Sequence, residues 1–386
     1  MIIIVEPQCS GFEHTEFNSA FLLLMQETFP SESILFFAEQ EHLQLVRGIV
    51  LSQLCSSIEY HSIIYPDRKL SEARRFISEL KFTRQIFKIA KKNNCRKLIF
   101  ASVNSPILWC IKLLLRLYTF VRVIVIPHSI LETINKKPHS GKPWIYVFWF
   151  RLSLKVRNLS RLKYLLLGES IRIELVKSMP KIGKYVNVID HPYRYAEYVA
   201  PLKEDLNVLR FGSLGTGRRE KGTDLFFSLA TDVRQRTDKS ASEFILIGPI
   251  TDEETRKLVT SDVLIPSDER ALSREDFDKY AHEIDYSVFC YPSESYKLTA
   301  SGAFFDALSF VKPIIALRNP FFEYYFKQLG DIGYLCQNYE EMLDVVIDLI
   351  RRKEDEPYIN QCNNIIKGRE LLGIPNLSVK MRDILC

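Results

Sequence analysis

Short aliphatic or β-branched runs alternate with helix-length amphipathic segments along the whole chain of 386 residues. This alternation is typical of parallel α/β architecture. In the first half, strands are predicted at Ile2–Val5, Ile34–Phe37, Ile58–Ile64, Lys97–Ser102, Val121–Ile126, Tyr164–Leu167 and Val186–Ile189. In the second half, they are predicted at Val208–Phe211, Phe244–Ile247, Val263–Ile265, Tyr286–Tyr291, Pro313–Leu317 and Gly333–Leu335.

A break in this pattern divides the chain. Residues 191–207 carry prolines, aromatics and charges with neither strand nor helix period, which places a domain boundary there. The prediction is an N-terminal acceptor-side domain at 1–195 and a C-terminal donor domain at 206–355. Helices at 356–386 are expected to pack back on the first domain. Two Rossmann-like α/β domains would face each other across a cleft at the carboxyl ends of their strands, where such sheets bind ligands.

Bulk composition favours a globular protein, with 47% hydrophobic and 26% charged residues. The eight cysteines lack metal-ligand or CxxC spacing, which favours reduced thiols and a cytoplasmic location. The opening MIIIVEP is expected to be a strand and not a signal peptide. Residues 106–126 are apolar, but Lys112, Arg116 and Arg122 interrupt them, so a helix followed by a buried strand is predicted.

Charge is distributed unevenly between the halves. Residues 1–200 carry 28 Lys and Arg against 16 Asp and Glu, whereas residues 201–386 carry 24 against 31. Basic residues alternate with Trp, Phe and Tyr at 142–164, a mixture that suits the headgroup layer of an anionic membrane. Peripheral contact with the inner membrane face is therefore expected, with a solvated basic face as the alternative. No nucleic-acid-binding motif accompanies the charge.

The segment 296–316, YKLTASGAFFDALSFVKPIIA, joins a small-residue turn, a helix and a strand. Thr299, Ser301 and Gly302 lie where the helix would begin, and helix N-termini present free N–H groups to phosphate. Asp306 follows one turn later, within reach of ribose hydroxyls. Lys312-Pro313 would end the helix. The sequence thus predicts a nucleoside diphosphate site.

A second phosphate candidate is the glycine-rich basic turn in residues 211–230. Its glycines are expected to allow a tight turn with positive φ, and its basic residues to neutralise a diphosphate. The glycines are Gly212, Gly215 and Gly217, and the basic residues are Arg218, Arg219 and Lys221. The spacing is not that of a P-loop.

Taken together, residues 206–340 resemble the donor domain of GT-B glycosyltransferases of the glycogen-synthase-like, family 4-like type. The shared order is FG, KGTD, ILIGP, SGAFFDAL, KPIIA and GYL. The resemblance implies that Lys221 contacts the diphosphate, with Arg218 or Arg219 as stand-ins, and that Asp306 binds the ribose. It also implies a UDP- or GDP-linked sugar as substrate and no cofactor or metal.

Two positions depart from that family. Ser213 follows Gly212 where the family usually has an arginine, although Ser213 remains a donor-binding candidate. Leu298 stands where the family usually has a glutamate, eight residues before Asp306. These differences leave open whether transfer retains or inverts the sugar.

In the N-terminal half, Glu13 and His14 follow the first strand and are candidates for the base that deprotonates an acceptor. Alternatively, Thr15 and its neighbours only cap a helix. His128 ends another strand, and the resembled family often has a histidine near the donor sugar there. His191 and Arg172 are weaker candidates for the same cleft. The acids of Asp276–Asp278 read as part of a helix cap and not as a metal motif.

These observations favour a metal-independent, hexosyltransferase-like glycosyltransferase. Its donor would be a nucleotide sugar, and its acceptor a hydroxyl of a surface polysaccharide or lipid-linked oligosaccharide. A nucleotide-sugar epimerase on the same scaffold is one alternative. A non-catalytic relative that binds a partner glycosyltransferase or the membrane is another.

Overall fold

The computed structural model describes residues 1–51, 57–65, 72–134, 142–156, 158–195, 208–267, 269–352 and 355–385. The chain forms two compact units. Unit 1 comprises Met1–Arg194, Leu298–Ala300 and Leu372–Cys386, and unit 2 comprises Tyr195–Lys297 and Ser301–Leu371. Most of the predicted boundary segment, 196–207, lies outside the described residues.

Unit 1 is built on a parallel sheet of seven strands in the order β3-β2-β1-β4-β5-β6-β7. The strands are β1 (Ile2–Val5), β2 (Ile34–Ala38), β3 (Ile58–Ser62), β4 (Lys97–Phe100), β5 (Arg122–Val125), β6 (Leu162–Leu166) and β7 (Val186–Val188). The central order 3-2-1-4-5-6 is that of the Rossmann fold. The carboxyl ends of β1, β4, β5 and β7 therefore meet at one edge.

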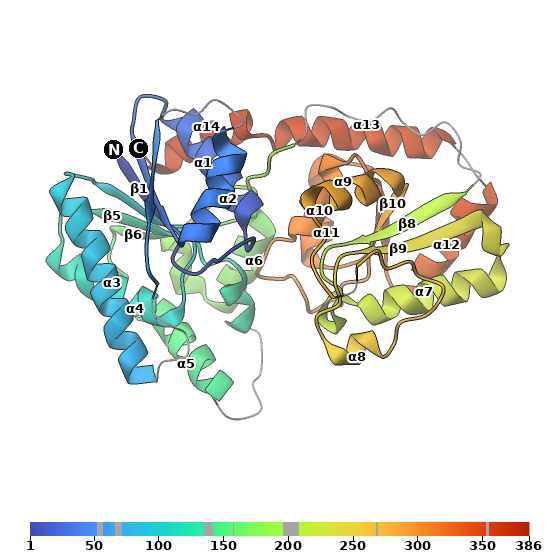
Figure 1. The fold of residues 1–386 in the computed structure, drawn as a ribbon, viewed down its shortest axis with the longest axis horizontal. Coiled ribbons are helices and arrows are strands. Elements are labelled where there is room, and N and C mark those ends of the chain that lie inside the picture. Colours follow the sequence, from blue (N-terminus) through green and yellow to red (C-terminus); the bar gives the residue numbers. More distant parts are fainter. Residues whose placement is uncertain are drawn as a thin grey trace. The chain divides into compact units, whose positions relative to one another are not determined.

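Helices cover both faces of this sheet because successive strand residues point to opposite sides. Ile3 and Val5 of β1 belong to one apolar cluster, and Ile2 and Ile4 to the other. The first cluster packs against α3 (Glu72–Lys92), α4 (Ser105–Leu117), α5 (Lys142–Lys155) and α6 (Glu169–Ser178). The second packs against α1 (Thr15–Thr28), α2 (Gln40–Leu51) and α14 (Ile374–Leu385) (Figure 1). Two short 3-10 helices are η1 (Ser129–Ile134) and η2 (Pro180–Tyr185).

Unit 2 has a parallel sheet of five strands in the order β12-β11-β10-β8-β9. The strands are β8 (Leu209–Leu214), β9 (Ser242–Ile247), β10 (Tyr286–Phe289), β11 (Ile314–Leu317) and β12 (Gly333–Cys336). The helical segments are η3 (Arg219–Lys221), α7 (Thr223–Arg236), η4 (Lys239–Ala241), α8 (Glu253–Arg256), α9 (Arg274–Glu283), α10 (Gly302–Ser309), α11 (Pro320–Leu329), α12 (Tyr339–Arg352) and α13 (Asp355–Leu371). The loop after β8 and the start of α10 hold the candidate donor site.

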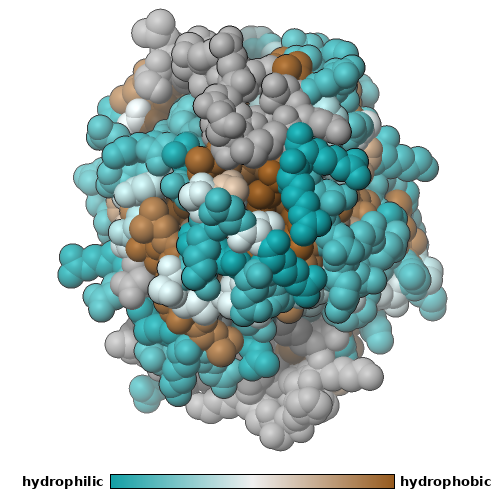
Figure 2. Space-filling model, turned by 90° about the vertical axis from the view of Figure 1, so that its right-hand side faces the viewer, coloured by the Kyte–Doolittle hydropathy of each residue, from teal (hydrophilic) through white to brown (hydrophobic). Residues whose placement is uncertain are grey.

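The surface of unit 2 follows the same inside-outside pattern. Helix α12 buries Met342, Val346 and Ile350 on one stripe, spaced four residues apart, and begins and ends with charged side chains. Figure 2 turns the right-hand side of Figure 1, where α12 lies, toward the viewer and shows mainly hydrophilic residues.

Most predicted strands are confirmed, but the one at Val263–Ile265 is wrong. Val263 is buried, but Leu264 is exposed and makes only an isolated bridge with Ile245, so the segment does not extend into a strand. The apolar segment 106–126 forms α4 and then the buried β5, as predicted. Among the described residues, no helix has both the length and the apolar character needed to cross a bilayer.

Six cysteines lie within the described residues, and all six are buried and free. Cys9, Cys95 and Cys110 belong to unit 1, whereas Cys290, Cys336 and Cys362 belong to unit 2. Cys55 and Cys386 lie outside the described residues.

Candidate functional site

The loop that follows β8 turns sharply at two glycines. Gly215 has φ +83° and Gly222 has φ +69°, values that an L side chain rarely adopts. A Cβ on Gly222 would lie 1.8 Å from the carbonyl oxygen of Cys290, so this position admits no side chain without a backbone shift. Gly222 is therefore what lets the loop pass close to the end of β10 before α7 begins.

Two other loop glycines serve packing, and the expectation of positive φ is wrong for them. Gly212 lies within β8, where an added Cβ would come within 2.6 Å of the Ile284 side chain. Gly217 forms an isolated parallel bridge with Ile250. Ser213, between Gly212 and Leu214, is a half-buried strand residue. The sharp turn of the loop therefore depends on Gly215 and Gly222.

Lys221 points its ammonium back toward Gly215 and α10. A Cβ on Gly215 would lie 3.6 Å from Lys221 Nζ and 4.0 Å from the Cβ of Ala303. Burial lowers the pKa of Lys221 to about 8, with a further contribution from the positive charge of Arg218, while Asp306 opposes the shift. A half-buried cation in this setting is short of negative charge, and an anion bound here would raise its pKa.

The two arginines of the loop, Arg218 and Arg219, have different partners. Arg218 donates from Nε to Thr251 Oγ1 at 2.9 Å and lies near enough to Lys221 to influence its pKa. Arg219 is exposed and lies 3.3 Å from a carboxylate oxygen of Glu254 and 3.7 Å from one of Asp224. Of the two stand-ins, Arg218 is thus the one placed beside Lys221.

The N-terminus of α10 is open on its outer side. Ser301 is the N-cap, and its buried hydroxyl accepts the N–H of Phe304 at 3.3 Å. Tyr291 supports this cap, since its hydroxyl lies 3.0 Å from Ser301 Oγ. A Cβ on Gly302 would meet no atom within 4 Å, so the first turn is accessible. Ser301 thus acts as a cap for the helix, and the backbone N–H groups of the first turn remain accessible at its N-terminus.

Asp306 lies one turn into α10 and is mostly buried, with 19% of its side chain exposed. Arg274, the first residue of α9, lies 3.7 Å from its carboxylate. The carboxylate also influences the pKa of Lys221. The structure therefore brings Gly215, Lys221 and Asp306 together. Arg274 was missed by the sequence reasoning, because nothing local to Ser273-Arg274 marks a neighbour on another helix.

Two nearby residues belong to unit 1 by their packing. Leu298 is fully buried in the first apolar cluster, and its backbone N–H donates to the Glu132 carboxylate at 2.7 Å. Thr299 lies in the same 298–300 segment. Where the resembled family usually carries a glutamate, this chain thus has an apolar core residue. The structure does not group Thr299 with the unit 2 residues.

In unit 1, three histidines surround one phenylalanine at the carboxyl edge of the sheet. The ring centroids of His14 and His128 are 4.8 Å apart, and those of Phe17 and His128 are 4.4 Å apart. Phe17 also lies 5.2 Å from His191. His128 follows β5 and His191 follows β7, so parallel strand ends bring these rings together.

The two inner histidines are held neutral. Burial lowers the pKa of His128 well below its usual range, and the charges of His14 and His191 add to the shift. Burial, followed by the charge of His14, lowers the pKa of His191 to about 3. The Nε2 atom of His128 is buried and has no hydrogen-bond partner among the described residues. Such a ring is suited to hydrogen-bond a sugar and is a weak base at neutral pH.

Glu13 and His14 occupy an exposed turn. His14 has φ 56° and is the N-cap of α1 without a side-chain cap bond. Glu13 accepts the N–H of Ser10 at 3.4 Å. Thr15 is the first residue of the helix and does not cap it, since its hydroxyl donates to Phe12 O, whereas Glu16 lies in the first turn. Arg172 is bound to Glu169, which occupies much of its guanidinium.

A buried polar network beneath this turn was missed by the sequence reasoning. Glu6, the residue after β1, accepts from Gln8 N at 2.9 Å, from Cys9 N at 3.2 Å and from Asn18 Nδ2 at 3.3 Å. Ser102 donates to the same carboxylate. The network positions the turn from two sides, because His42 Nδ1 lies 2.9 Å from Gly11 O and His42 Nε2 lies 2.9 Å from Asn18 Nδ2.

The acids at Asp276–Asp278 have structural partners. Ser273 accepts the N–H of Asp276 at 3.1 Å, which confirms the predicted helix cap. Asp278 lies 2.8 Å from Arg274. Among the residues that the structure describes, no group of three or more His, Cys, Asp or Glu side chains is arranged to hold a metal ion.

Comparison with known proteins identifies the architecture. No protein-family profile and no curated protein sequence matches this chain. Solved structures do match along its whole length. OtsA in its apo state aligns with a TM-score of 0.67 at 9% identity, covering 100% of this chain and 99% of that one. The chain has the GT-B fold.

Two further GT-B structures align comparably. Anabaena Alr3699/HepE in complex with UDP-glucose gives a TM-score of 0.66 at 11% identity, covering 100% of this chain and 98% of that one. WaaG, described as a glycosyltransferase involved in lipopolysaccharide biosynthesis, gives 0.64 at 10% identity, covering 100% and 99%. The predicted fold class is thus confirmed.

The same scaffold also supports other chemistry. A Listeria monocytogenes protein assigned as a UDP-N-acetylglucosamine 2-epimerase aligns with a TM-score of 0.56 at 12% identity, covering 98% of this chain and 94% of that one. Function must therefore be argued from the residues of the site.

Proposed function

We propose that this chain is a glycosyltransferase that moves a hexosyl group from a UDP- or GDP-linked donor to a hydroxyl of a surface glycan or lipid-linked acceptor. The observation that carries the proposal is the convergence of Lys221, Gly215 and the open first turn of α10, with Asp306 one turn further along. A diphosphate at the helix N-terminus would meet backbone N–H groups and a half-buried ammonium at once.

The charge on the leaving diphosphate would be stabilised by groups that unit 2 already holds. Lys221 and the dipole of α10 face that charge as the bond to the sugar breaks, and Arg218 adds a third positive group. These groups would supply the charge without a divalent metal. The Asp306 carboxylate would accept hydrogen bonds from the ribose hydroxyls. Among the aligned structures, the HepE complex contains UDP-glucose.

Unit 1 would serve the sugar and the acceptor. The unpartnered Nε2 of His128 would hydrogen-bond a sugar hydroxyl. Its low pKa makes it a poor base, so proton removal from the acceptor would fall to His14 or Glu13 on the exposed turn.

The test is a titration of UDP and GDP into the wild-type chain and into Asp306→Ala, followed by calorimetry. Binding of one diphosphate should weaken about tenfold in the variant, because charge-assisted hydrogen bonds contribute about 1.5 kcal/mol or more. The difference in affinity between the wild type and Asp306→Ala should disappear when the nucleotide lacks both ribose hydroxyls. Equal affinity of both proteins for the normal nucleotide would remove the ribose assignment.

The epimerase is the second candidate, because its scaffold also matches. Incubation with UDP- and GDP-sugars in the absence of acceptor separates the two. Conversion of a donor to its epimer would favour the epimerase. Transfer that needs an added glycan would favour the glycosyltransferase, and nucleotide binding with neither reaction would favour a non-catalytic relative.

A further inference from the structure

The helices α3, α4 and α5 of unit 1 share one face of the sheet and form its outer layer there (Figure 1). Apolar side chains remain exposed on this layer instead of facing the core. Leu117 is 77% exposed and Leu113 is 44% exposed on α4, while Trp149 is 48% exposed on α5. Phe120 and Phe148 are exposed nearby. Such a concentration of large apolar groups on one layer indicates an interaction surface.

The aromatic rings of this surface are held in place. The indole of Trp109 lies edge-on to that of Trp149, with ring centroids 6.2 Å apart, and its Nε1 donates to Trp149 O at 3.3 Å. Phe148 packs against Trp149 at 5.7 Å. Helices α4 and α5 therefore present an ordered aromatic group whose rings have both apolar and polar parts, as at membrane interfaces.

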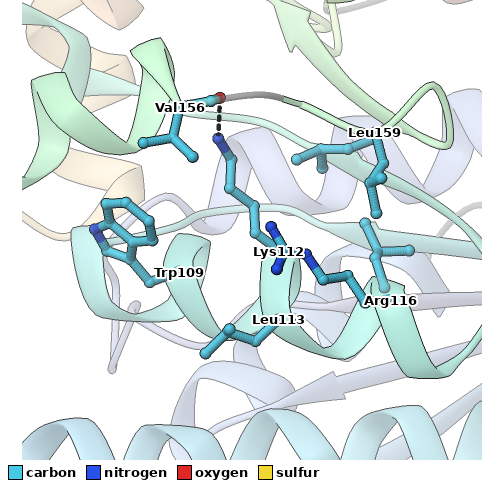
Figure 3. Close-up of a pocket in the computed structure, with 8 residues that line it drawn as sticks. Trp109, Lys112, Leu113, Arg116, Val156 and Leu159 are labelled. Atoms are coloured by element: carbon cyan, nitrogen blue, oxygen red, sulfur yellow. Dashed lines mark hydrogen bonds between the residues drawn. The ribbon is translucent and has the colours of Figure 1, made fainter.

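A shallow pocket between the two helices is too small to be the binding site itself. Trp109, Lys112, Leu113, Arg116 and Val156 line it (Figure 3), and its volume is about 40 Å³. Since one water molecule needs about 10–15 Å³ on this measure, the pocket holds only a few water molecules. The surface around the pocket, and not its interior, is what is large enough to meet a partner.

Lys112 ties the two helices together beneath this surface. Its ammonium donates to Val156 O at 3.0 Å, as drawn in Figure 3, and also to Ser153 O. Burial lowers its pKa to about 8. Lys112 thus satisfies carbonyl groups at the end of α5, which leaves Arg116 at the pocket rim as the outward-facing cation of this helix.

The charge of the layer is mainly positive. Residues 72–156 contain 17 Lys and Arg but only three acids, Glu72, Glu79 and Glu132. Glu79 is fully buried, 3.0 Å from Arg75, and so contributes nothing to the surface. The exposed basic side chains of α3 include Arg74, Lys81, Arg84, Lys88, Lys91 and Lys92. Basic groups therefore flank the exposed apolar ones.

We propose that the outer surface of α3, α4 and α5 docks on an anionic lipid bilayer. The lysines and arginines would meet the headgroups, and Leu113, Leu117 and Trp149 would enter the interfacial layer. A polynucleotide would use the basic residues but would leave the exposed leucines in water. Docking is a property beyond the proposed transfer reaction, because it requires neither donor nor acceptor.

The experiment is co-sedimentation of the full chain with vesicles of phosphatidylcholine alone or mixed with phosphatidylglycerol. The wild type should bind the anionic vesicles at least about tenfold more tightly, since each basic residue near such a surface contributes about fivefold. The double variant Leu113→Asp/Leu117→Asp should lose about tenfold or more. The matched control is Val379→Asp, which changes a residue 60% exposed on α14 and should bind like the wild type.

Charge is tested separately with Lys88→Glu/Lys91→Glu against the control pair Lys239→Glu/Arg382→Glu, whose residues are exposed on other elements. Thermal unfolding identifies any variant that fails to fold. If one of the two double variants does not fold, vesicle binding by the other tests the proposal. Equal binding to both vesicle types, no vesicle binding, or equal loss in variants and controls would overturn the proposal. Tighter binding to single-stranded RNA than to anionic vesicles would overturn it in favour of a nucleic-acid surface.

Discussion

The two units place opposite kinds of polar groups at the carboxyl edges of their sheets. In unit 1, desolvation lowers the pKa values of His128 and His191, and the buried carboxylate of Glu6 accepts hydrogen bonds from four donors of its own unit. In unit 2, Lys221 and Asp306 are charged groups beside an accessible helix start. The contrast teaches that Glu6 is used within unit 1 to fix the shape of a turn, whereas Lys221 and Asp306 leave charge beside an accessible helix start in unit 2.

The largest effect is expected at Glu6. Glu6→Ala would leave four hydrogen-bond donors inside unit 1 without their acceptor, so the free energy of unfolding should fall by about 3 kcal/mol. Urea unfolding followed by fluorescence measures this. Glu13→Ala is the matched control, because Glu13 is exposed and accepts one long bond. A change below about 0.5 kcal/mol in Glu6→Ala would break the distinction between the units.

In contrast to Glu6→Ala, Lys221→Met should weaken nucleotide binding without lowering stability. Affinity for UDP or GDP should fall by about 2 kcal/mol, roughly thirtyfold, because a charge-assisted bond to phosphate is lost. Stability should stay the same or rise, since burial already disfavours the ammonium in the folded chain. Calorimetry and thermal unfolding supply the two readouts, with the exposed Lys239→Met as control. Loss of stability with unchanged affinity would contradict the contrast.

Acid should weaken unit 1 through its histidines. The unfolded chain binds protons on His191 below about pH 6.5, whereas the folded chain resists until pH is near 3. The free energy of unfolding should therefore fall as pH falls through this window, by at most about 1.4 kcal/mol per pH unit for this group. Stability above pH 6.5 should be unaffected by it.

The check is a pair of variants measured from pH 7 to pH 4. His191→Gln should have a shallower pH dependence than the wild type. His282→Gln changes an exposed histidine of α9 and should match the wild type. If the free energy of unfolding has the same pH dependence in both variants, His191 is not the cause of the loss of stability in acid.

Sequence reasoning recovered the strands because parallel strands, buried on both faces, read as apolar runs. It also singled out Lys221 and Asp306 from a local turn and a helix start, and the structure brings the two residues together. It failed where distant segments meet. Glu6 and Ser102 are 96 residues apart, and nothing beside either one marks the other.

The glycines show the same limit, because the sequence does not distinguish a glycine needed for its backbone conformation from one needed for close packing. Gly212 avoids the Ile284 side chain and needs no special φ, although in sequence it resembles Gly215. Gly222 has the most severe constraint of the loop, because its neighbour is a carbonyl from β10's far end, which no local pattern reveals. Turn chemistry is readable from sequence, whereas close approach between elements is not.

The buried cysteines allow the opening of each unit to be measured at native residues, without introducing new ones. Within the described residues, each unit holds three thiols, and burial raises the pKa of Cys95 and Cys110 in one and of Cys336 and Cys362 in the other. Alkylation requires an exposed thiolate, so each thiol reacts only when its surroundings open. Labelling at these positions, read by mass spectrometry, therefore times the opening of each unit independently.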